Sequence, residues 1–410
     1  MGNSIYPVPS AGASYSSQPP ASASSVLLDG QLVTASSIST TVTGTGAPWL
    51  LYANGAGTTT ITVGSDTYSV PAGSTVGTSA YTGSKSVTVA APAGFGTTAP
   101  ASFTASTLPS SSYWNSVAYG NGYFVAVASY TTTNAYSTDG ITWNTSTMPS
   151  NPVWAAVTYG NGYFVAVANG STSAASSTHG TTWTARTMPS AVNWYGAAYG
   201  LVGATPTYVA VAGYGSTPTP TSSAASSTNG TTWTARTMPS SENWISVTYG
   251  NGTFVAVSRN GSTNGSAYST NGTTWTASSL GTNTYYGIAY GNGLFVTVYS
   301  NTVWYSPDGI TWNASTMPSS QLFLTIAYGN GYFVAIGSLV TIGAYSANGT
   351  TWTALTMPNS SGWSSATYGN GKFVVISGGI IMGSSNAAAY FTQLLLPVAY
   401  GIYNGATVRA

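Results

Sequence analysis

The chain has 410 residues, of which 43% are hydrophobic and only 3% are charged. Ordinary globular domains are about one quarter charged, so hydroxyl, amide and backbone groups must supply most of the polar surface. The formal net charge of +1 provides no basic surface for nucleic acid or for an anionic membrane, and we expect neither as a partner.

Several features of other protein classes are missing from the sequence. Cysteine is absent, which excludes disulfides and thiolate metal sites. The N-terminal residues lack the basic stretch and apolar core of a signal peptide, and no apolar run is long enough to span a membrane. We therefore expect a protein made in the cytoplasm. Its low charge gives copies little reason to repel one another, which favours a homo-oligomer or a larger assembly.

The N-terminal quarter of the chain divides by composition. Residues 1–25 are rich in Ser, Ala and Pro and have few apolar side chains to bury, so we expect an extended arm that partner subunits hold in place. Residues 26–92 alternate apolar and polar residues around the turns Asp29-Gly30 and Asn54-Gly55, which predicts a small β-sandwich-like domain. Residues 93–101 follow as a linker.

Residues 102–397 are built from one repeat. Its first signature is WNSVAYGNGYFVAV at Trp114–Val127, with near copies beginning at Trp154, Trp194, Trp244, Tyr286, Phe323 and Trp363. Its second is STDGITW at Ser137–Trp143, with the tryptophan recurring at positions 183, 233, 275, 312 and 352. The period is therefore near 40 residues, with one long insertion in the third copy.

Each copy predicts four short strands. Strand A covers Val117–Tyr119, a Gly-Asn-Gly turn leads into strand B at Phe124–Val127, strand C covers Ala135–Ser137, and an Asp-Gly turn leads into strand D around Trp143. Four antiparallel strands at this period are typical of a propeller blade. Because one blade cannot bury both faces alone, we predict an all-β fold dominated by a seven-bladed β-propeller.

The tryptophans of the repeat are interpreted as packing groups between blades, because aromatic residues recur at fixed blade positions. Those of strand D are Trp143, Trp183, Trp233, Trp275, Trp312 and Trp352.

The way in which the ring closes stays open. The segment Ile380–Pro397 aligns without gaps with Thr341–Pro358, which would make Phe391 the strand D aromatic of the last blade. Ser102–Pro109 also resembles strand D, so it either replaces that last strand or only leads into the first blade. Residues 398–410 predict a C-terminal hairpin around Asn404-Gly405, which pairs either with the N-terminal domain or with another copy.

The turn before strand D resembles the motif S-x-D-x-G-x-T-W of Asp-box, or BNR-like, propellers. This sequence has S-x-D-G-x-T-W at Ser137–Trp143 and Ser306–Trp312, one residue shorter between Asp and Gly. The Asp is replaced by Asn229, Asn271 and Asn348, and once by His179. The resemblance implies the fold but no activity. Similar arrays in Ser/Thr-rich chains of low charge also resemble bacteriophage tail-fibre and other virion proteins.

Sialidases share this box, and the sequence argues against their chemistry. A sialidase needs three convergent arginines, whereas the repeats contain only Arg186, Arg236 and Arg259, and the first two fall in the outer strand D. Glu242 and Arg259 are expected to form a structural ion pair. His179 has no metal-ligand spacing around it and is interpreted as a turn residue. We expect no enzymatic activity, no catalytic residue, no metal and no cofactor.

Contact residues are expected on the face that carries the variable B–C loops and D–A connections. The ligand-binding candidates on that face are Tyr130, Tyr214, Glu242, Arg259 and Tyr299. Aromatic and hydroxyl groups of this kind suit sugars.

These patterns favour a non-enzymatic structural protein of a virion, such as a phage fibre or tail-associated adhesin. Its arm would bind other virion subunits and its propeller would contact a host-surface glycan or protein. Two alternatives remain: a capsid or neck decoration protein that stabilises the particle, and a sialidase-like carbohydrate-active enzyme.

Overall fold

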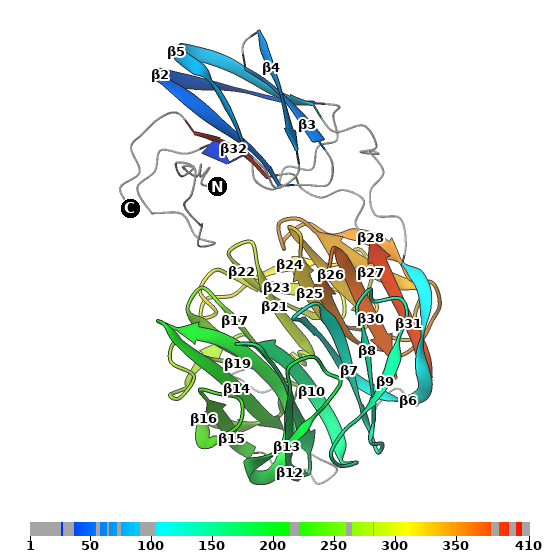
Figure 1. Ribbon diagram of the computed structural model, residues 1–410. Helices are drawn as coiled ribbons and strands as arrows, with labels where there is room; N and C mark the ends of the chain where they lie inside the picture. Colours follow the sequence, from blue (N-terminus) through cyan, green and yellow to red (C-terminus); the bar gives the residue numbers. More distant parts are fainter. Residues whose placement is uncertain are drawn as a thin grey trace. The chain divides into compact units, whose positions relative to one another are not determined.

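The computed structural model describes residues 26–27, 37–54, 58–63, 65–71, 75–90, 103–213, 221–259, 265–281, 283–378, 385–392 and 399–403. These residues form strands and turns and contain no helix, and so no helix able to cross a membrane. The predicted arm, the linker and the Asn404-Gly405 turn lie outside them. The chain divides into two compact units, Pro100–Gln393 and a smaller one made of Met1–Ala99 with Leu394–Ala410 (Figure 1).

The smaller unit is one antiparallel sheet of six strands in the order β1-β32-β2-β5-β3-β4. Its strands are β1 (Val26–Leu27), β2 (Ser37–Asn54), β3 (Thr58–Val63), β4 (Asp66–Pro71), β5 (Thr75–Ala90) and β32 (Ala399–Tyr403). Strands β2 and β5 pair along most of their length, from Ser37↔Ala90 to Tyr52↔Thr75. The described residues of this unit form one hydrogen-bonded sheet, and the sandwich-like packing expected for the domain stays a prediction.

The C-terminal strand belongs to this smaller unit. Strand β32 pairs with β2 from Leu50↔Tyr403 to Asn54↔Ala399 and with β1 on its other edge. Of the two partners considered for the tail, the N-terminal domain is therefore the one that the structure shows.

The larger unit repeats a four-stranded antiparallel sheet, which we call a blade, in the order A-B-C-D. A complete example is β17 (Trp244–Gly250), β18 (Thr253–Ser258), β19 (Gly265–Ser269) and β20 (Thr276–Ser279). Strands that follow the same order are β6 (Thr104–Gly120), β7 (Tyr123–Ser129), β8 (Thr133–Ser137) and β9 (Asn144–Thr147); β10 (Val153–Gly160), β11 (Tyr163–Asn169), β12 (Ser171–Ser177) and β13 (Thr184–Val202); β14 (Thr205–Gly213), β15 (Thr221–Ser227) and β16 (Thr234–Glu242); β21 (Gly287–Gly291), β22 (Leu294–Tyr299), β23 (Thr302–Ser306) and β24 (Asn313–Thr316); β25 (Phe323–Gly329), β26 (Tyr332–Gly337), β27 (Ile342–Ser346) and β28 (Thr353–Thr356); and β29 (Trp363–Gly369), β30 (Lys372–Ser377) and β31 (Ser385–Thr392). The predicted all-β, propeller-type fold is confirmed.

Two turn motifs shape each blade. In the A–B hairpin, Asn121 (φ 48°) and Gly122 (φ 82°) have the positive φ values of a tight β-hairpin turn. In the box before strand D, Asp139 Oδ1 accepts the N–H groups of Ile141 and Thr142, each at 2.8 Å. Asn229 accepts the N–H groups of its own turn in the same way, which explains why Asn can replace Asp in the repeat.

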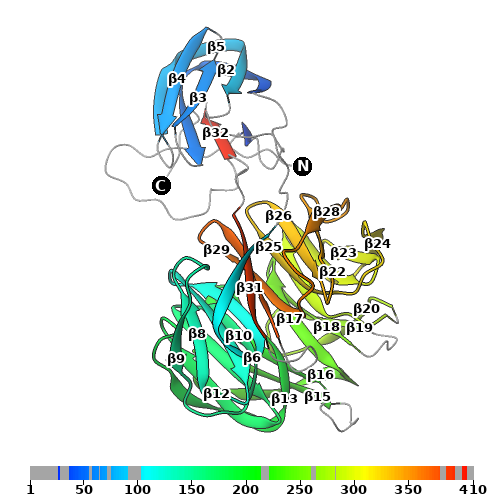
Figure 2. The same cartoon turned by 90° about the vertical axis from the view of Figure 1, so that its right-hand side faces the viewer.

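Adjacent blades fit together through a glycine and a tyrosine of their A strands. A Cβ atom on Gly120 would lie 2.0 Å from the ring of Tyr159, so only glycine allows this approach. The same contact recurs at Gly160–Tyr199, Gly200–Tyr249, Gly250–Tyr290, Gly291–Tyr328, Gly329–Tyr368 and Gly369–Tyr119. Because the last pair returns to the strand that began the series, the blades form a closed ring (Figures 1 and 2).

The core lies between blades. One cluster joins Trp154, Phe164 and Trp183 of one blade to Val125 and Val127 of the preceding blade. The strand D tryptophans Trp143, Trp183, Trp233, Trp275 and Trp352 are 7–8% exposed, whereas Trp312 is only partly buried.

The ring is closed by the N-terminal strand of the propeller. Residues Thr104–Thr107 of β6 pair with β31 from Tyr390↔Thr104 to Ala387↔Thr107, and β6 and β31 lie side by side in both views (Figures 1 and 2). The gapless alignment of the last repeat was therefore wrong. Phe391 pairs with Phe373 of β30, which makes β31 a strand C, and Phe103 is buried where the strand D aromatic of the last blade would stand.

The start of the fifth copy also needs a correction, by one residue. Tyr285 is fully buried, and its hydroxyl donates to the carbonyl of Leu280 at 2.8 Å. The indole of Trp154 donates in a similar way to the Ser150 carbonyl. Tyr285 is therefore the counterpart of the tryptophan, and Tyr286 occupies the next position.

Candidate functional site

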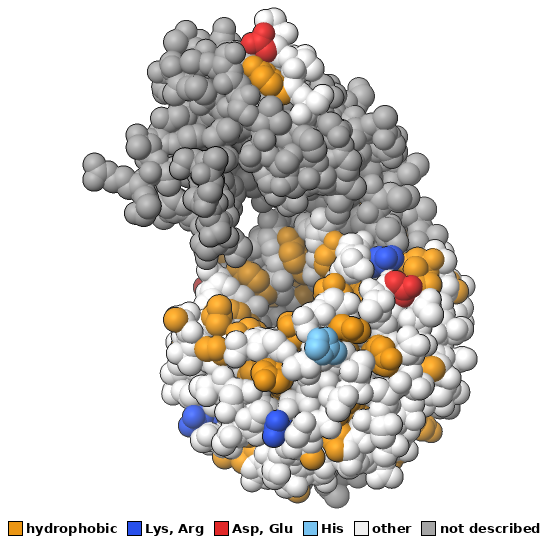
Figure 3. Space-filling view, viewed as in Figure 1, with side chains coloured by type: hydrophobic (Ala, Val, Ile, Leu, Met, Phe, Trp, Pro, Cys, Tyr) orange, Lys and Arg blue, Asp and Glu red, His pale blue; other side chains and the backbone are white. Residues whose placement is uncertain are grey.

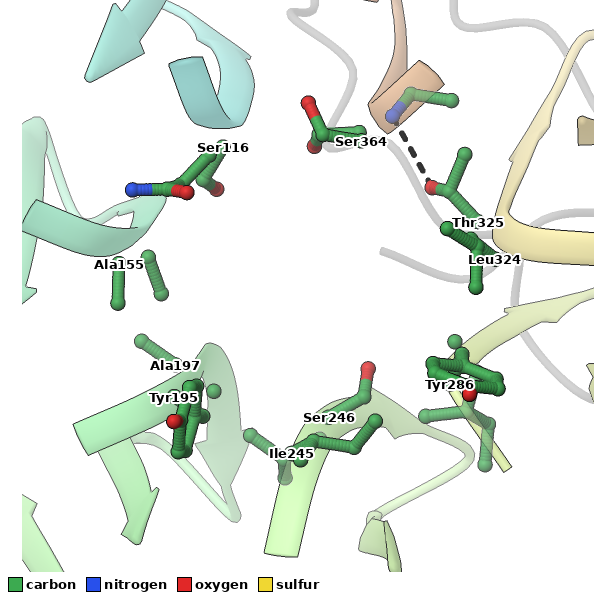
Figure 4. Close-up of a pocket in the computed structure, with 18 of the residues that line it drawn as sticks. Ser116, Ala155, Tyr195, Ala197, Ile245, Ser246, Tyr286, Leu324, Thr325 and Ser364 are labelled. Carbon is green, nitrogen blue, oxygen red and sulfur yellow. Dashed lines mark hydrogen bonds between the residues drawn. The ribbon is translucent and has the colours of Figure 1, made fainter. Parts of the chain in front are cut away.

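A pocket of about 220 Å³ lies on the propeller axis, which we call the axial pocket. Strand A of every blade contributes to its wall (Figure 4). Each of these strands begins with a buried aromatic residue, which we call the anchor: Trp114, Trp154, Trp194, Trp244, Tyr285, Phe323 or Trp363. The wall is formed by the residues at one to three positions after the anchors.

A β-bulge after the anchor exposes the next side chain to the pocket. The register between strands A and B shifts between the anchor and the second residue after it in six of the described strands A, for example between Trp194 and Gly196. Such bulges change the direction of a side chain. The residues thus placed are Asn115, Ala155, Tyr195, Ile245, Leu324 and Ser364, and Tyr286 has the equivalent position.

One part of the wall is polar, and its side chains tie neighbouring blades together. Ser364 Oγ donates to the Trp114 carbonyl at 2.7 Å, and Asn115 Nδ2 donates to the Trp154 carbonyl at 2.6 Å. Because these groups bond to adjacent strands, this arc has a structural role in joining neighbouring blades.

The opposite part of the wall is aromatic, and a cation packs against one of its rings. Tyr195, Ile245 and Tyr286 follow one another around the axis (Figure 4). The guanidinium carbon of Arg259, which follows β18, lies 5.1 Å from the centroid of the Tyr286 ring, a distance typical of a cation–π contact.

Electrostatics link Tyr195 to two of the residues predicted from the sequence. Burial raises the pKa of the Tyr195 hydroxyl, Arg259 lowers it and Tyr130 raises it, with a net increase. Arg259 and Tyr130 therefore both lie within electrostatic range of Tyr195.

Tyr130 stands at the start of a B–C loop. Its side chain is 64% exposed, its φ is 56°, and its ring meets the edge of Tyr113 at a centroid distance of 6.0 Å. The next blade has only Ala155 and Gly170 at the positions of Asn115 and Tyr130.

The other predicted ligand residues do not line this pocket. Tyr299 ends β22 and packs against the cluster around Tyr285 and Phe295. Glu242 ends β16, is buried, and has no hydrogen-bond partner for its Oε2. We expected an ion pair between Glu242 and Arg259, and none joins them within the described residues. The Arg259 guanidinium lies over the Tyr286 ring instead. Tyr214 lies outside the described residues.

Tyr195 and Tyr286 were not among the residues predicted from the sequence to bind a ligand. Their signal is the position directly after the anchor, which changes from copy to copy while the anchor stays aromatic. In a regular strand, alternation would not point the side chain directly after the anchor toward the axis. The β-bulge points it there.

The remaining charged groups lie elsewhere. Arg186 and Arg236 donate to Ser176 and Ser226 of their own blades at 3.0 and 2.9 Å. His179 is exposed in a turn with its Nδ1 2.8 Å from the Thr178 hydroxyl. Figure 3 shows few charged side chains on one face of the molecule. No group of three or more His, Asp or Glu side chains within the described part of the chain could hold a metal ion.

Comparisons with known proteins reveal likeness of fold alone. No family model and no curated protein matches the chain. Among solved structures, a streptogramin B lyase has 14% identity and a TM-score of 0.58 over 73% of this chain and 97% of its own. The selenomethionine form of virginiamycin B lyase from Staphylococcus aureus has 11% identity and a TM-score of 0.60, over 71% and 99%. A catalytically inactive histidine-to-alanine variant of that lyase, with quinupristin, has 10% identity and a TM-score of 0.58, over 73% and 99%. The chain thus shares the propeller-type architecture of these lyases.

Proposed function

We propose that this chain is a non-enzymatic binding protein whose seven-bladed propeller contacts sugars through the axial pocket, as part of a virion fibre or tail-associated adhesin. The blade number is supported by the closed series of glycine–tyrosine contacts, in which Gly369 meets Tyr119.

The observation that carries the proposal is the aromatic arc of the axial pocket. Tyr195 and Tyr286 stand on either side of Ile245, and Arg259 lies over Tyr286. Aromatic rings stack on the apolar faces of sugars, and polar groups around them accept and donate hydrogen bonds. The pocket is smaller than the 300–1,000 Å³ of sites for drug-sized ligands, so it suits one sugar ring of a longer glycan.

The placement of charged residues supports binding without catalysis. A glycosidase needs two carboxyl groups that face each other across the sugar, and none of the described residues in the wall of the axial pocket is Asp or Glu. Virginiamycin B lyase is inactive when one of its histidines is replaced by alanine, whereas the single histidine of this chain, His179, stands in an exposed turn.

The virion setting is supported by composition. A chain with 3% charged residues suits a subunit held in an assembly better than a free protein at high concentration. Display of many copies would raise a weak affinity for each sugar by avidity. A capsid or neck decoration protein would share this composition but would not need the aromatic arc.

A glycan array probed with the full chain tests the binding function. We expect retention of a set of glycans, a loss of about tenfold or more for Tyr286→Ala because a stacking platform is removed, and no change for Tyr163→Ala, an exposed tyrosine after an A–B turn. Mass spectrometry of the bound glycans checks for products. Release of shortened glycans would show that the chain is an enzyme. If the chain bound no glycan on the array, the proposed sugar-binding function would be wrong.

A label on the propeller tests the setting separately. We expect electron microscopy to find it on fibres or tails of the parent particle. A label confined to the capsid or neck would favour the decoration protein, and particles without label would exclude a virion role.

A further inference from the structure

The backbone N–H groups at the third position after the anchors face the preceding blade beside the axial pocket. In three blades a hydroxyl of the preceding blade accepts them. The bonds are Val117 N–H to Ser365, Val157 N–H to Ser116 and Ala366 N–H to Thr325, each at 3.1 Å. These residues all stand opposite strand B in the same register, as in the pair Val117↔Ala126.

In three further blades the preceding blade offers no hydroxyl, and in the blade that contains Ile288 the preceding blade has Ser246 at this position. The corresponding residues of the preceding blades are Ala156, Gly196 and Gly287, which have no hydroxyl. Ala197, Val247 and Ile326 have the same pairing with strand B, namely Ala197↔Ala210, Val247↔Ala256 and Ile326↔Ala335. No side chain of the described residues accepts their N–H groups. We infer that these three donors face the axial pocket.

A positive charge stands on the same side. Arg259 lies over Tyr286 and within electrostatic range of Tyr195, and no acidic residue forms an ion pair with it within the described residues. Free N–H donors and a cation together favour a ligand rich in acceptor oxygens that also has a negative charge.

We propose that the axial pocket recognises an acidic sugar of the uronic acid class. This proposal rests on the proposed sugar-binding function and specifies its ligand. The apolar face of the sugar ring stacks on tyrosine, its carboxylate pairs with Arg259, and its ring oxygens accept from the backbone N–H groups. A neutral sugar would satisfy the tyrosines and the N–H donors and leave Arg259 without its partner.

The test is titration calorimetry on the full chain with D-glucuronic acid, D-glucose and inorganic phosphate as separate probes. We expect glucuronic acid to bind about tenfold more tightly than glucose, the effect of one charge-assisted contact, and its affinity to fall with added salt. We expect phosphate to compete weakly, because it has no apolar face for the tyrosines.

Two sets of variants separate the contributions. Arg259→Gln should remove the preference for glucuronic acid, so that the two sugars bind with similar affinity, Arg259→Lys should retain part of the preference, and Arg186→Gln, in an outer strand, should change nothing. Ala156→Ser supplies a hydroxyl for the Ala197 N–H, as Ser116 does for Val157, and should weaken both sugars several-fold. Its control is Ala185→Ser, which adds a hydroxyl at an exposed position of β13.

The outcomes distinguish this inference from the function on which it rests. Equal binding of glucose and glucuronic acid, or a preference that survives Arg259→Gln, would overturn the acidic specificity while sugar binding stands. Phosphate binding as tight as that of glucuronic acid would show a simple anion site and would also overturn it. If the chain bound no sugar on the array, the proposed sugar-binding function itself would be wrong.

Discussion

At the scale of single residues, the propeller depends on positions where only one side chain fits. The glycine that ends strand A lets the ring of the next tyrosine approach the backbone. For Gly160 an added Cβ would lie 1.9 Å from the Tyr199 ring. The repeat YGNG therefore encodes contacts between blades as well as the hairpin turn, and this second role could not be deduced from turn chemistry alone.

We expect Gly160→Ala to lower the free energy of unfolding by about 1–3 kcal/mol, the usual cost of overpacking. The control is Gly162→Ala two residues later, where φ is +83° but an added Cβ meets nothing within 4 Å. Urea denaturation of both variants measures the difference. A larger loss for Gly162→Ala would show that backbone conformation matters more than the contact between blades.

The two acidic boxes give stability a dependence on pH. Partial burial raises the pKa of Asp139, but hydrogen bonds from Ile141, Thr142 and Ser137 outweigh it, so the pKa lies below its ordinary value of 3.8. Asp308 has the same net shift from the same kind of hydrogen bonds. A carboxyl whose pKa is lower in the folded state stabilises the fold above pH 3.8 and loses this contribution as the pH falls through the folded pKa.

The double variant Asp139→Asn, Asp308→Asn should therefore lose less stability between pH 7 and pH 2 than the natural chain does. Asn229 shows that asparagine keeps the hydrogen bonds of the box, so the variant should fold. Chemical unfolding at both pH values measures the free energy of unfolding of each protein. Arg186→Gln is the control, because it changes a charge and keeps every carboxyl group. An equal loss in both proteins would mean that other groups cause the acid sensitivity.

At the scale of elements, local patterns predicted the strands well, and registers could be predicted only where a turn fixed them. The Asn-Gly and Asp-Gly turns set strands A to D of most copies. The last copy lacks the Asp-Gly turn, and its alignment placed Phe391 in strand D although it lies in strand C. In the fifth copy the adjacent tyrosines Tyr285 and Tyr286 allowed the alignment of the repeat to slip by one residue. The full burial of Tyr285 identifies it as the anchor.

The residues of the candidate site could be predicted only in part. Tyr130 and Arg259 stood out as unusual loop residues, and both influence the pKa of Tyr195 in the pocket wall. Tyr195 and Tyr286 were missed because a β-bulge, which has no signature of its own here, directs the residue after the anchor toward the axis.

The closing strand can be tested through Phe103, which is 3% exposed. If Thr104–Thr107 completes the last blade, Phe103→Ala leaves a cavity between two blades and should cost about 3–5 kcal/mol. Ile141→Ala, at an exposed side chain, should cost much less. Guanidinium denaturation measures both, and a small effect at Phe103 would mean that the strand only leads into the first blade.

At the scale of the whole molecule, pairing between distant segments determines the architecture. Strand β31 meets the start of β6, and β32 meets β2 in the other unit. Pairings of such long sequence separation leave no local pattern, so the sequence allowed two ways to close the ring and two partners for the tail. The closed ring gives the axial pocket its wall, because every strand A contributes to it.

We propose the axial pocket as the binding site, and a crystal structure of the full chain soaked with D-glucuronic acid would show whether a sugar occupies it. We predict a sugar ring in the axial pocket against Tyr195 or Tyr286, with its carboxylate near Arg259. A sugar bound at any other place, with only solvent in the axial pocket, would show that this pocket is not the binding site.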